Sequence, residues 1–195
     1  MNLIVISPES EDPREQPLLA AFFAAGLRSY HVRKPTWTRD QLAAWLRTLP
    51  AEFHPRLFLH SHHELAEEFK IGGVHFRSTD GGPSPLRRSR AVHDLATLRG
   101  SLDSYDRLLF SPVFPSISKP GHEPDSRIAP REIQAVIARP HRAEVVALGG
   151  VDRTRLATCR ELGFDGVAVL GAIWQAADPR RAFHELQNAL LADAA

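Results

Sequence analysis

The sequence has little cysteine, no excess of either charge and no long apolar run, and each shortage excludes a class of protein. Cys159 is the only cysteine, so no disulfide forms within the chain, and a reducing cytoplasm is the expected location. The 24 lysines and arginines are balanced by 23 aspartates and glutamates, whereas nucleic-acid-binding proteins show a basic excess. No stretch approaches the roughly 18 apolar residues of a membrane span. The start, MNLIVIS, turns acidic at Glu9, so we expect no signal peptide.

What is present is the composition of an ordinary globular protein. The chain has 195 residues, of which 43% are hydrophobic, enough for one domain over residues 1–195 with a sizeable core. Histidine is the unusual count, at ten residues. Composition alone does not explain them, so their positions have to decide their role.

Short apolar runs alternate with longer amphipathic stretches along the whole chain. The runs predict strands at Leu3–Ser7, Tyr30–Arg33, Arg56–His60, Gly73–Phe76, Ala91–His93, Leu108–Phe110, Val145–Leu148 and Gly166–Leu170. The stretches predict helices at Gln16–Gly26, Arg39–Thr48, His63–Lys70, Pro130–Ala138, Asp152–Leu162 and Pro179–Ala192. Because most runs are continuously apolar, we expect parallel strands buried on both faces.

This alternation is typical of the α/β class. Eight strands suit a closed (β/α)₈ TIM barrel, although a doubly wound open sheet has the same alternation. Ser78–Ser89 is rich in glycine, proline and arginine and predicts a loop or a short helix. Lys119–Ser126 predicts a second loop, after the sixth strand.

Polar residues gather where these strands are expected to end. Ligands of parallel α/β folds bind at the carboxyl ends of the strands. Four histidines come at four successive strand ends, namely His31, His60, His75 and His93. We expect at least one of them to contact a ligand, while any single one could equally be a packed core histidine.

Two glycine-containing loops follow the last two strands. Gly149 and Gly150 follow VVAL and precede a helix that Asp152 is expected to cap, and Leu170-Gly171 follows the eighth strand. Glycine lets backbone N–H groups approach an anion, and a helix N-terminus adds positive charge. The two loops together predict a phosphate site, which barrels often place after strands seven and eight.

Metal and nucleophile patterns are weak. Neither HxH nor HExxH occurs, and in the cluster HSHH at 60–63 we expect His62 and His63 to begin a helix and face solvent. No GxSxG is present, and Cys159 falls in the middle of a predicted helix, where an inert buried thiol is expected.

Several segments in order resemble one enzyme family. They are YHVRKP at 30–35, LFLHSHHELAEEF at 57–69, GVHFRSTD at 73–80, AVH at 91–93, FSPVFPSISK at 110–119, VVALGG at 145–150 and GFDGVAVLGAIW at 163–174. The chain resembles the thiamin phosphate synthase/TenI family over nearly its whole length. This resemblance implies the closed (β/α)₈ barrel rather than the open sheet.

The family has two branches, and the resemblance to them is unequal. Synthases join a pyrimidine pyrophosphate to a thiazole phosphate with Mg²⁺, whereas TenI-like members tautomerise a thiazole phosphate carboxylate and need no cofactor. Of the synthase motif QxRxK, only Arg33 is kept in place: His31 replaces the glutamine and Pro35 the lysine, with Lys34 one place early. The synthase Asn-Asp pair is His60-Ser61 here, which leaves Asp80 as the one expected metal aspartate.

The phosphate end and one histidine, by contrast, match the TenI-like branch. His93 aligns with the histidine that tautomerases use for proton transfer, so the resemblance implies a thiazole tautomerase with His93 as the base and Arg33 stabilising carboxylate charge. The implied binding residues are Gly149, Gly150, Leu170, Gly171, Ser116, Ser118, Lys119, His31, Lys34, His60 and His75.

Two alternatives stay open. One is a thiamin phosphate synthase, in which Arg33, Lys34, Lys119 and a Mg²⁺ ion at Asp80 would serve the pyrophosphate. The other is a non-catalytic binder of thiazole phosphate or thiamin phosphate, which would be indifferent to His93. In each case the partner is a small phosphorylated thiazole, with neither nucleic acid nor membrane, and a homo-oligomer stays open.

Overall fold

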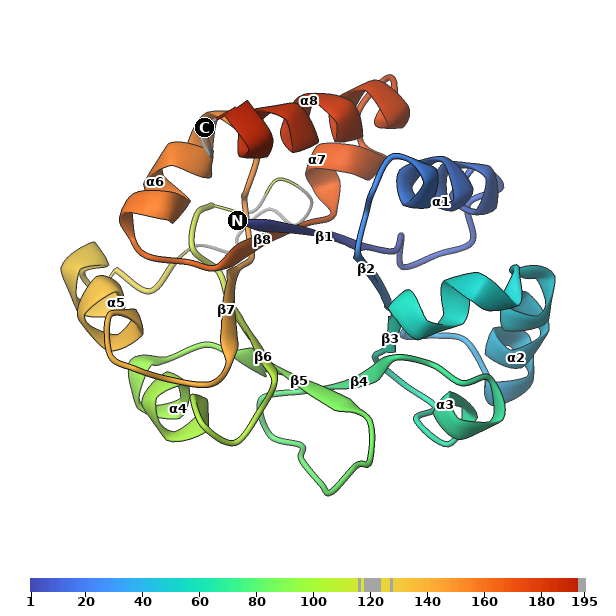
Figure 1. Cartoon of the computed structure of the whole chain (residues 1–195), viewed down its shortest axis with the longest axis horizontal. Coiled ribbons are helices and arrows are strands. Elements are labelled where there is room, and N and C mark those ends of the chain that lie inside the picture. Colours follow the sequence, from blue (N-terminus) through green and yellow to red (C-terminus); the bar gives the residue numbers. More distant parts are fainter. Residues whose placement is uncertain (116, 118–123, 127, 193–195) are drawn as a thin grey trace.

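The computed structural model describes residues 1–115, 117, 124–126 and 128–192. Eight strands pair in chain order and close on themselves, because β1 pairs with both β2 and β8. Every pair in the barrel is parallel. The helices lie outside this ring of strands (Figure 1). The expected (β/α)₈ barrel is therefore confirmed, and the open sheet is excluded.

The strands agree with the predicted runs apart from their ends. They are β1 Asn2–Ile6, β2 Ser29–Val32, β3 Leu57–Leu59, β4 Gly73–Phe76, β5 Arg87–Val92, β6 Arg107–Phe110, β7 Glu144–Ala147 and β8 Gly166–Val169. The largest error is at β5, which begins at Arg87 rather than Ala91, inside the segment predicted as a loop. Polar residues form this part of the strand because they pair with β4 and β6 on both sides.

The helices differ more from the prediction. They are α1 Glu15–Ala24, α2 Arg39–Thr48, α3 Leu65–Glu68, α4 Leu95–Ser101, α5 Pro130–Ile137, α6 Leu156–Glu161, α7 Gly171–Trp174 and α8 Pro179–Ala192, with 3₁₀ turns at Ala51–Arg56 and Arg153–Arg155. The sequence prediction missed α4 and α7. The sequence signal that could have predicted α4 is Asp94, a typical N-cap residue. In the structure Asp94 Oδ1 accepts the N–H of Thr97 at 2.7 Å. No helix in the described part of the chain combines the length and apolar character needed to cross a membrane.

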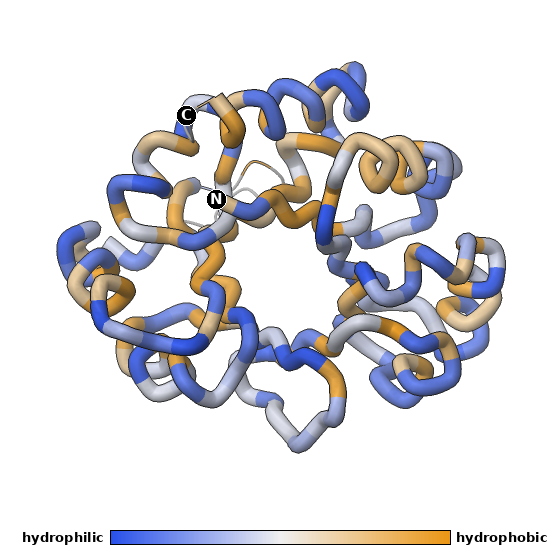
Figure 2. Tube along the Cα trace, in the orientation of Figure 1, coloured by the Kyte–Doolittle hydropathy of each residue, from blue (hydrophilic) through white to orange (hydrophobic). Residues whose placement is uncertain are grey.

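The apolar core lies mainly between the strands and the helices. Phe22 of α1 stacks on Phe183 of α8 with ring centroids 4.5 Å apart, which joins the two ends of the chain. A second, smaller core fills part of the barrel interior and consists of Ile4, Ile6, Leu109, Val146 and Ala168. The tube is orange along β7 and β8 but largely blue along β5 (Figure 2). The interior is therefore apolar on one side and polar on the other.

Candidate functional site

The glycine loop after β7 is held against the loop after β6. The N–H of Val113 donates to the carbonyl oxygen of Leu148 at 2.9 Å, and that of Phe114 to Gly149 at 3.1 Å. Gly149 and Gly150 have φ of +91° and +64°, in the left-handed region. A Cβ on Gly150 would lie 2.1 Å from the carbonyl oxygen of Pro115. Only glycine fits this close approach of two backbones.

The N–H groups of the glycine loops are available to a ligand. Among the hydrogen bonds between described residues, none is donated by the N–H of Gly149, Gly150, Leu170 or Gly171. An anion over β7 and β8 could therefore accept from them. The helix start after Gly150, which was expected to add positive charge to the phosphate site, is less suitable for binding an anion. Asp152 caps this helix start as predicted, because its carboxylate accepts the N–H of Thr154 at 2.8 Å, and its negative charge there disfavours an anion.

His93 lies just beyond β5 and is exposed. Its Nδ1 is 2.7 Å from the carbonyl oxygen of Ser111. A carbonyl oxygen only accepts, so Nδ1 carries a proton, and in the neutral imidazole the Nε2 lone pair has no partner among the described residues. His93 lines a cavity of about 400 Å³ with Pro112 and Phe114, which are also the residues packed against the glycine loop. His93 and the glycine loop after β7 thus flank the same segment after β6.

Arg33 and Lys34 follow β2 but have different environments. The Arg33 guanidinium is about one-third exposed, at 33%, and forms an ion pair with Glu9. Its backbone is held by Ser7, whose Oγ accepts the Arg33 N–H at 2.8 Å. Arg33 can therefore meet a ligand at the barrel mouth by exchanging or sharing its carboxylate partner.

The expectation that Lys34 binds substrate is corrected by its burial. Its side chain has 0% exposure, and Nζ donates to Glu15 Oε2 at 2.6 Å. Nζ also donates to the carbonyl oxygens of Pro8 and Ser10 at 2.8 and 3.0 Å. All three donors of the ammonium are thus used to hold the β1–α1 segment.

The residues that the structure describes do not fit a Mg²⁺ site. Asp80, the one expected metal aspartate, is exposed, and its Oδ2 lies 4.0 Å from Arg77 Nε. Among the described residues, the one group of three or more candidate donors consists of His31, His60 and His75. Mg²⁺ prefers carboxylate, carbonyl and water oxygens to imidazole nitrogens. No step of a mechanism is therefore assigned to this ion.

The three histidines meet in the barrel interior, which corrects the prediction for two of them. His31 and His75 lie within β2 and β4 and are buried, while His60 follows β3 and is half-buried. His31 Nδ1 is 2.9 Å from His60 Nε2, and the rings of His60 and His75 stack at 4.0 Å. Residues alternate between the two faces of a strand, so an inward position inside a strand replaces the expected position at its end.

Burial makes all three imidazoles neutral at pH 7. Loss of solvation, followed by the charge of Arg107, lowers the pKa of His31 well below its ordinary value. Loss of solvation, followed by His75, does the same to the pKa of His60. For His75, loss of solvation is again the main cause and lowers the pKa to about 3.

Sequence reasoning missed the polar residues beneath this cluster. Arg107 of β6 points into the barrel, where Nε donates to Glu144 Oε2 and Nη1 to Ser29 Oγ, each at 2.8 Å. Nη1 also lies 3.1 Å from His31 Nε2. The available signal in the sequence was Arg107 itself. It directly precedes the apolar residues Leu108–Phe110, and the prediction placed it outside the strand. A charge at an inward strand position requires partners, and the chain supplies them from two other strands, β2 and β7.

Several expected site residues cannot be placed or lie elsewhere. Ser116, Ser118 and Lys119 fall outside the described residues. His62 and His63 do not begin a helix: His62 has φ of +52°, and α3 starts at Leu65. Both are half-buried, with Nε2 atoms 2.8 and 3.2 Å from the carbonyl oxygens of Trp37 and His75. Cys159 is buried as expected, which raises the pKa of its thiol to about 11.

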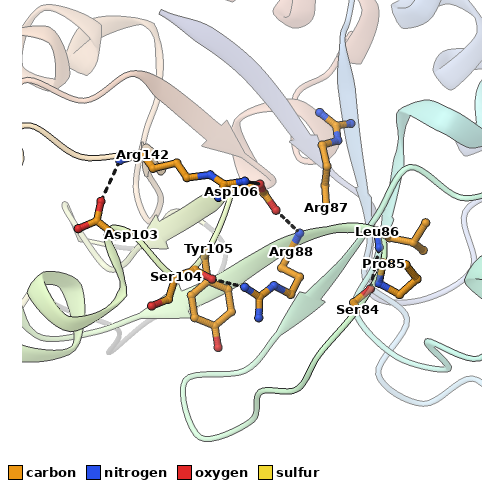
Figure 3. Close-up of a pocket in the computed structure, with 10 residues that line it drawn as sticks. All are labelled: Ser84, Pro85, Leu86, Arg87, Arg88, Asp103, Ser104, Tyr105, Asp106 and Arg142. Carbon is orange, nitrogen blue, oxygen red and sulfur yellow. Dashed lines mark hydrogen bonds and ion pairs between the residues drawn. The ribbon is translucent and has the colours of Figure 1, made fainter.

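A second cavity, of about 300 Å³, opens at the amino ends of β5 and β6, away from the strand ends described above (Figure 3). Its charged groups contact one another. Asp106 Oδ2 accepts the backbone N–H of Arg88 at 2.8 Å, and Asp103 Oδ1 accepts the backbone N–H of Arg142 at 3.3 Å. The carboxyl ends of the strands therefore remain the candidate site.

Comparisons with known proteins point to one family. A family model described as "Thiamine monophosphate synthase" matches residues 3–173. A thiamine-phosphate synthase of Methylobacillus flagellatus is 30% identical and is aligned over 96% of this chain and 95% of its own length. One of Listeria monocytogenes is 28% identical over 77% of this chain and 74% of its own.

Solved structures show the same fold. A thiamine phosphate pyrophosphorylase from Bacteroides thetaiotaomicron superposes with a TM-score of 0.82 at 23% identity, over 97% of this chain and 98% of that one. One from Pyrococcus furiosus gives a TM-score of 0.81 at 20% identity, over 98% of this chain and 96% of that one.

Proposed function

Because this chain belongs to the thiamine monophosphate synthase family, we propose that it binds a thiazole phosphate and tautomerises its ring, with His93 as the base. The observation that carries this proposal is the hydrogen bond from His93 Nδ1 to the Ser111 carbonyl oxygen, 2.7 Å long. It leaves Nε2 as a fixed, accessible base beside the phosphate-binding loops.

The proposed reaction needs only groups that this site offers. His93 Nε2 removes a proton from a ring carbon of a thiazole phosphate carboxylate, and the ring electrons shift. The imidazolium then returns a proton to a carbon outside the ring, so no sp³ carbon is left in the ring, the product is an aromatic isomer, and no atom is gained or lost. Gly150 and Gly171 would hold the phosphate through their N–H groups, and Arg33 would face the carboxylate.

The second candidate is a thiamin phosphate synthase, which the printed names of the relatives favour over a tautomerase. It would join a pyrimidine to the same thiazole phosphate and release pyrophosphate. Two observations weigh against it among the described residues. Lys34 is engaged by Glu15, and Asp80 has no second carboxylate with which to hold Mg²⁺.

Two assays on the purified chain separate these functions. In the first, the thiazole phosphate carboxylate tautomer is supplied alone, and the aromatic isomer is followed. We expect turnover that falls about 10²- to 10⁴-fold in His93→Ala, the usual contribution of a general base. His184→Ala, on α8, is the matched control and should retain the rate. A rate that His93→Ala leaves unchanged would contradict the proposal.

In the second assay, the pyrimidine pyrophosphate, thiazole phosphate and Mg²⁺ are supplied together. Sustained formation of thiamin phosphate would establish the synthase in place of the tautomerase. If both assays fail while calorimetry detects thiazole phosphate binding, the chain is a non-catalytic binder.

A further inference from the structure

The polar contacts inside the barrel form a continuous chain from its amino end to its mouth. Glu144 at the start of β7 accepts from Arg107 Nε at 2.8 Å, and Arg107 Nη1 reaches His31 Nε2 at 3.1 Å. His31 Nδ1 in turn lies 2.9 Å from Nε2 of His60, which follows β3. Four residues from four strands thus connect a buried ion pair with a half-buried imidazole.

In this chain of contacts, Arg107 determines which ring nitrogen carries the proton in His31 and in His60. A guanidinium only donates, so His31 Nε2 must accept, and the proton of a neutral His31 is on Nδ1. His31 Nδ1–H then donates to His60 Nε2, which places the His60 proton on Nδ1. Burial lowers the pKa of both histidines well below the ordinary value, so both are neutral at pH 7 and the assignment holds there.

The chain of contacts ends on a donor that has no partner among the described residues. No hydrogen bond between described residues engages His60 Nδ1. Its ring is held by stacking on His75, whose Nδ1 is itself 2.9 Å from Ser89 Oγ. Arg33 is near enough to add its charge to the surroundings of His60. The mouth of the barrel therefore presents one oriented N–H beside one cation.

We propose that the Glu144–Arg107–His31–His60 chain is a positioning relay that presents His60 Nδ1–H as a fixed hydrogen-bond donor to an anionic acceptor of the substrate. The acceptor class is a carboxylate, and this assignment of the ligand rests on the proposed function. Because guanidinium keeps its protons, no proton can be supplied from the lower end. The relay therefore orients His60 and transfers no proton, whereas His93 takes one.

The same geometry argues against a metal ion at the three histidines, although their ligand atoms lie within 4.8 Å of one another. A metal on His31 Nδ1 would require the proton on Nε2, where it would face the Arg107 N–H. The non-ligating nitrogen of a metal-bound histidine normally donates to a carboxylate, a carbonyl or water. Here the non-ligating nitrogen, His31 Nε2, would instead face a donor, the Arg107 N–H.

The relay is tested first by nitrogen NMR of the histidine side chains of the whole protein between pH 6 and 8. We expect Nδ1–H tautomers for both His31 and His60. The double variant Arg107→Met/Glu144→Gln removes the donor without leaving an unpaired carboxylate, and it should release His31 into a mixture of tautomers. An Nε2–H signal from His60 in the unaltered protein, or Zn²⁺ binding that shifts all three histidines, would overturn the relay.

The donor role is tested by binding two ligands, the thiazole phosphate with and without its carboxylate. In His60→Leu, affinity for the carboxylated ligand should fall roughly tenfold to a hundredfold, as for a hydrogen bond to a charged group. Affinity for the other ligand should be unchanged. His60→Gln, whose amide can accept and donate, should restore most of the loss.

An equal loss for both ligands would reject the donor role. If the unaltered protein binds neither ligand, the proposed function fails and the ligand assignment fails with it. The NMR result still decides the relay by itself, so the two failures are distinguishable.

Discussion

The two sides of the barrel interior are made by strands of one parallel sheet but carry opposite kinds of side chain. Strands β1, β6, β7 and β8 contribute the inner apolar cluster, which is Ile4, Ile6, Leu109, Val146 and Ala168. The facing side carries His31, His60, His75 and the arginine that reaches them from β6. In Figure 2 the trace is orange along β7 and β8, which belong to the apolar side.

The apolar side supports the structure, whereas the polar side positions the groups that are proposed to contact the ligand. The apolar side lies beneath the glycine loops after β7 and β8, where a tightly packed floor holds backbone N–H groups in place. The polar side gives each buried imidazole a defined partner, and an unpaired polar group there would be costly. A phosphorylated ligand lying across the mouth would thus have its phosphate over the apolar side and its ring near the histidines.

The largest expected effect comes from breaking the buried charge pair at the edge of the polar side. Lys34→Met leaves the carboxylate of Glu15, which is 2% exposed, without its cation. Loss of one partner of a buried pair costs about 3–5 kcal/mol of unfolding free energy. Urea unfolding measures this change.

Lys34→Met/Glu15→Gln is the matched control for that variant. It removes both charges, so it should recover much of the lost stability. Equal stabilities for Lys34→Met and the unaltered protein would show that the pair contributes little.

The apolar side is expected to affect stability without affecting recognition. Leu109→Ala removes a fully buried side chain of the inner cluster and should lower the unfolding free energy by about 2–5 kcal/mol. Thiazole phosphate affinity, measured by calorimetry well below the melting temperature, should stay within about twofold. A large loss of affinity at unchanged stability would contradict the division of the interior.

Acid should destabilise the polar side selectively. The pKa of His75 is about 3 in the folded protein against 6.5 ordinarily, so the unfolded chain binds more protons between these values. The stabilising contribution of neutral His75 is fully present above pH 6.5 and is lost progressively as the pH drops toward 3. At pH 5 this one group should cost roughly 2 kcal/mol.

Thermal melts at pH 5 and 7 measure this loss of stability. His75→Asn, which has no titrating group, should show a smaller difference between the two pH values. A melting temperature that His75→Asn leaves with the same pH dependence would contradict the assignment.

Local pattern was sufficient for the eight strands and for the glycine loops, whereas the closed barrel was predicted only from the family resemblance. Continuous apolar runs between amphipathic stretches predicted all eight strands, and helices such as Arg39–Thr48 and Pro179–Ala192 were predicted to the residue. Gly149 and Gly150 were recognisable because a left-handed turn after a buried strand admits few other residues. Short helices such as α4 escaped because one capping residue is a weaker signal than a periodic face.

The environment of each polar side chain was not readable in the same way. Lys34 and Arg33 are neighbours in the chain, yet one is sealed against Glu15 and the other reaches the mouth. Arg107 was assigned to no site, because the residues that accept its hydrogen bonds come from β2 and β7.

The sequence by itself therefore determined the alternation of eight strands with helices, the position of the glycine loops and the presence of histidines near the carboxyl ends of the strands, and its family resemblance favoured the closed barrel. Only the tertiary structure decided that three of these histidines meet, that Arg107 Nη1 lies beside His31 Nε2, and that His93 Nδ1 lies against the Ser111 carbonyl oxygen. The physical reason is that strand formation depends on neighbours along the chain, whereas a proton's position depends on the atom that accepts it, and here that atom belongs to another strand.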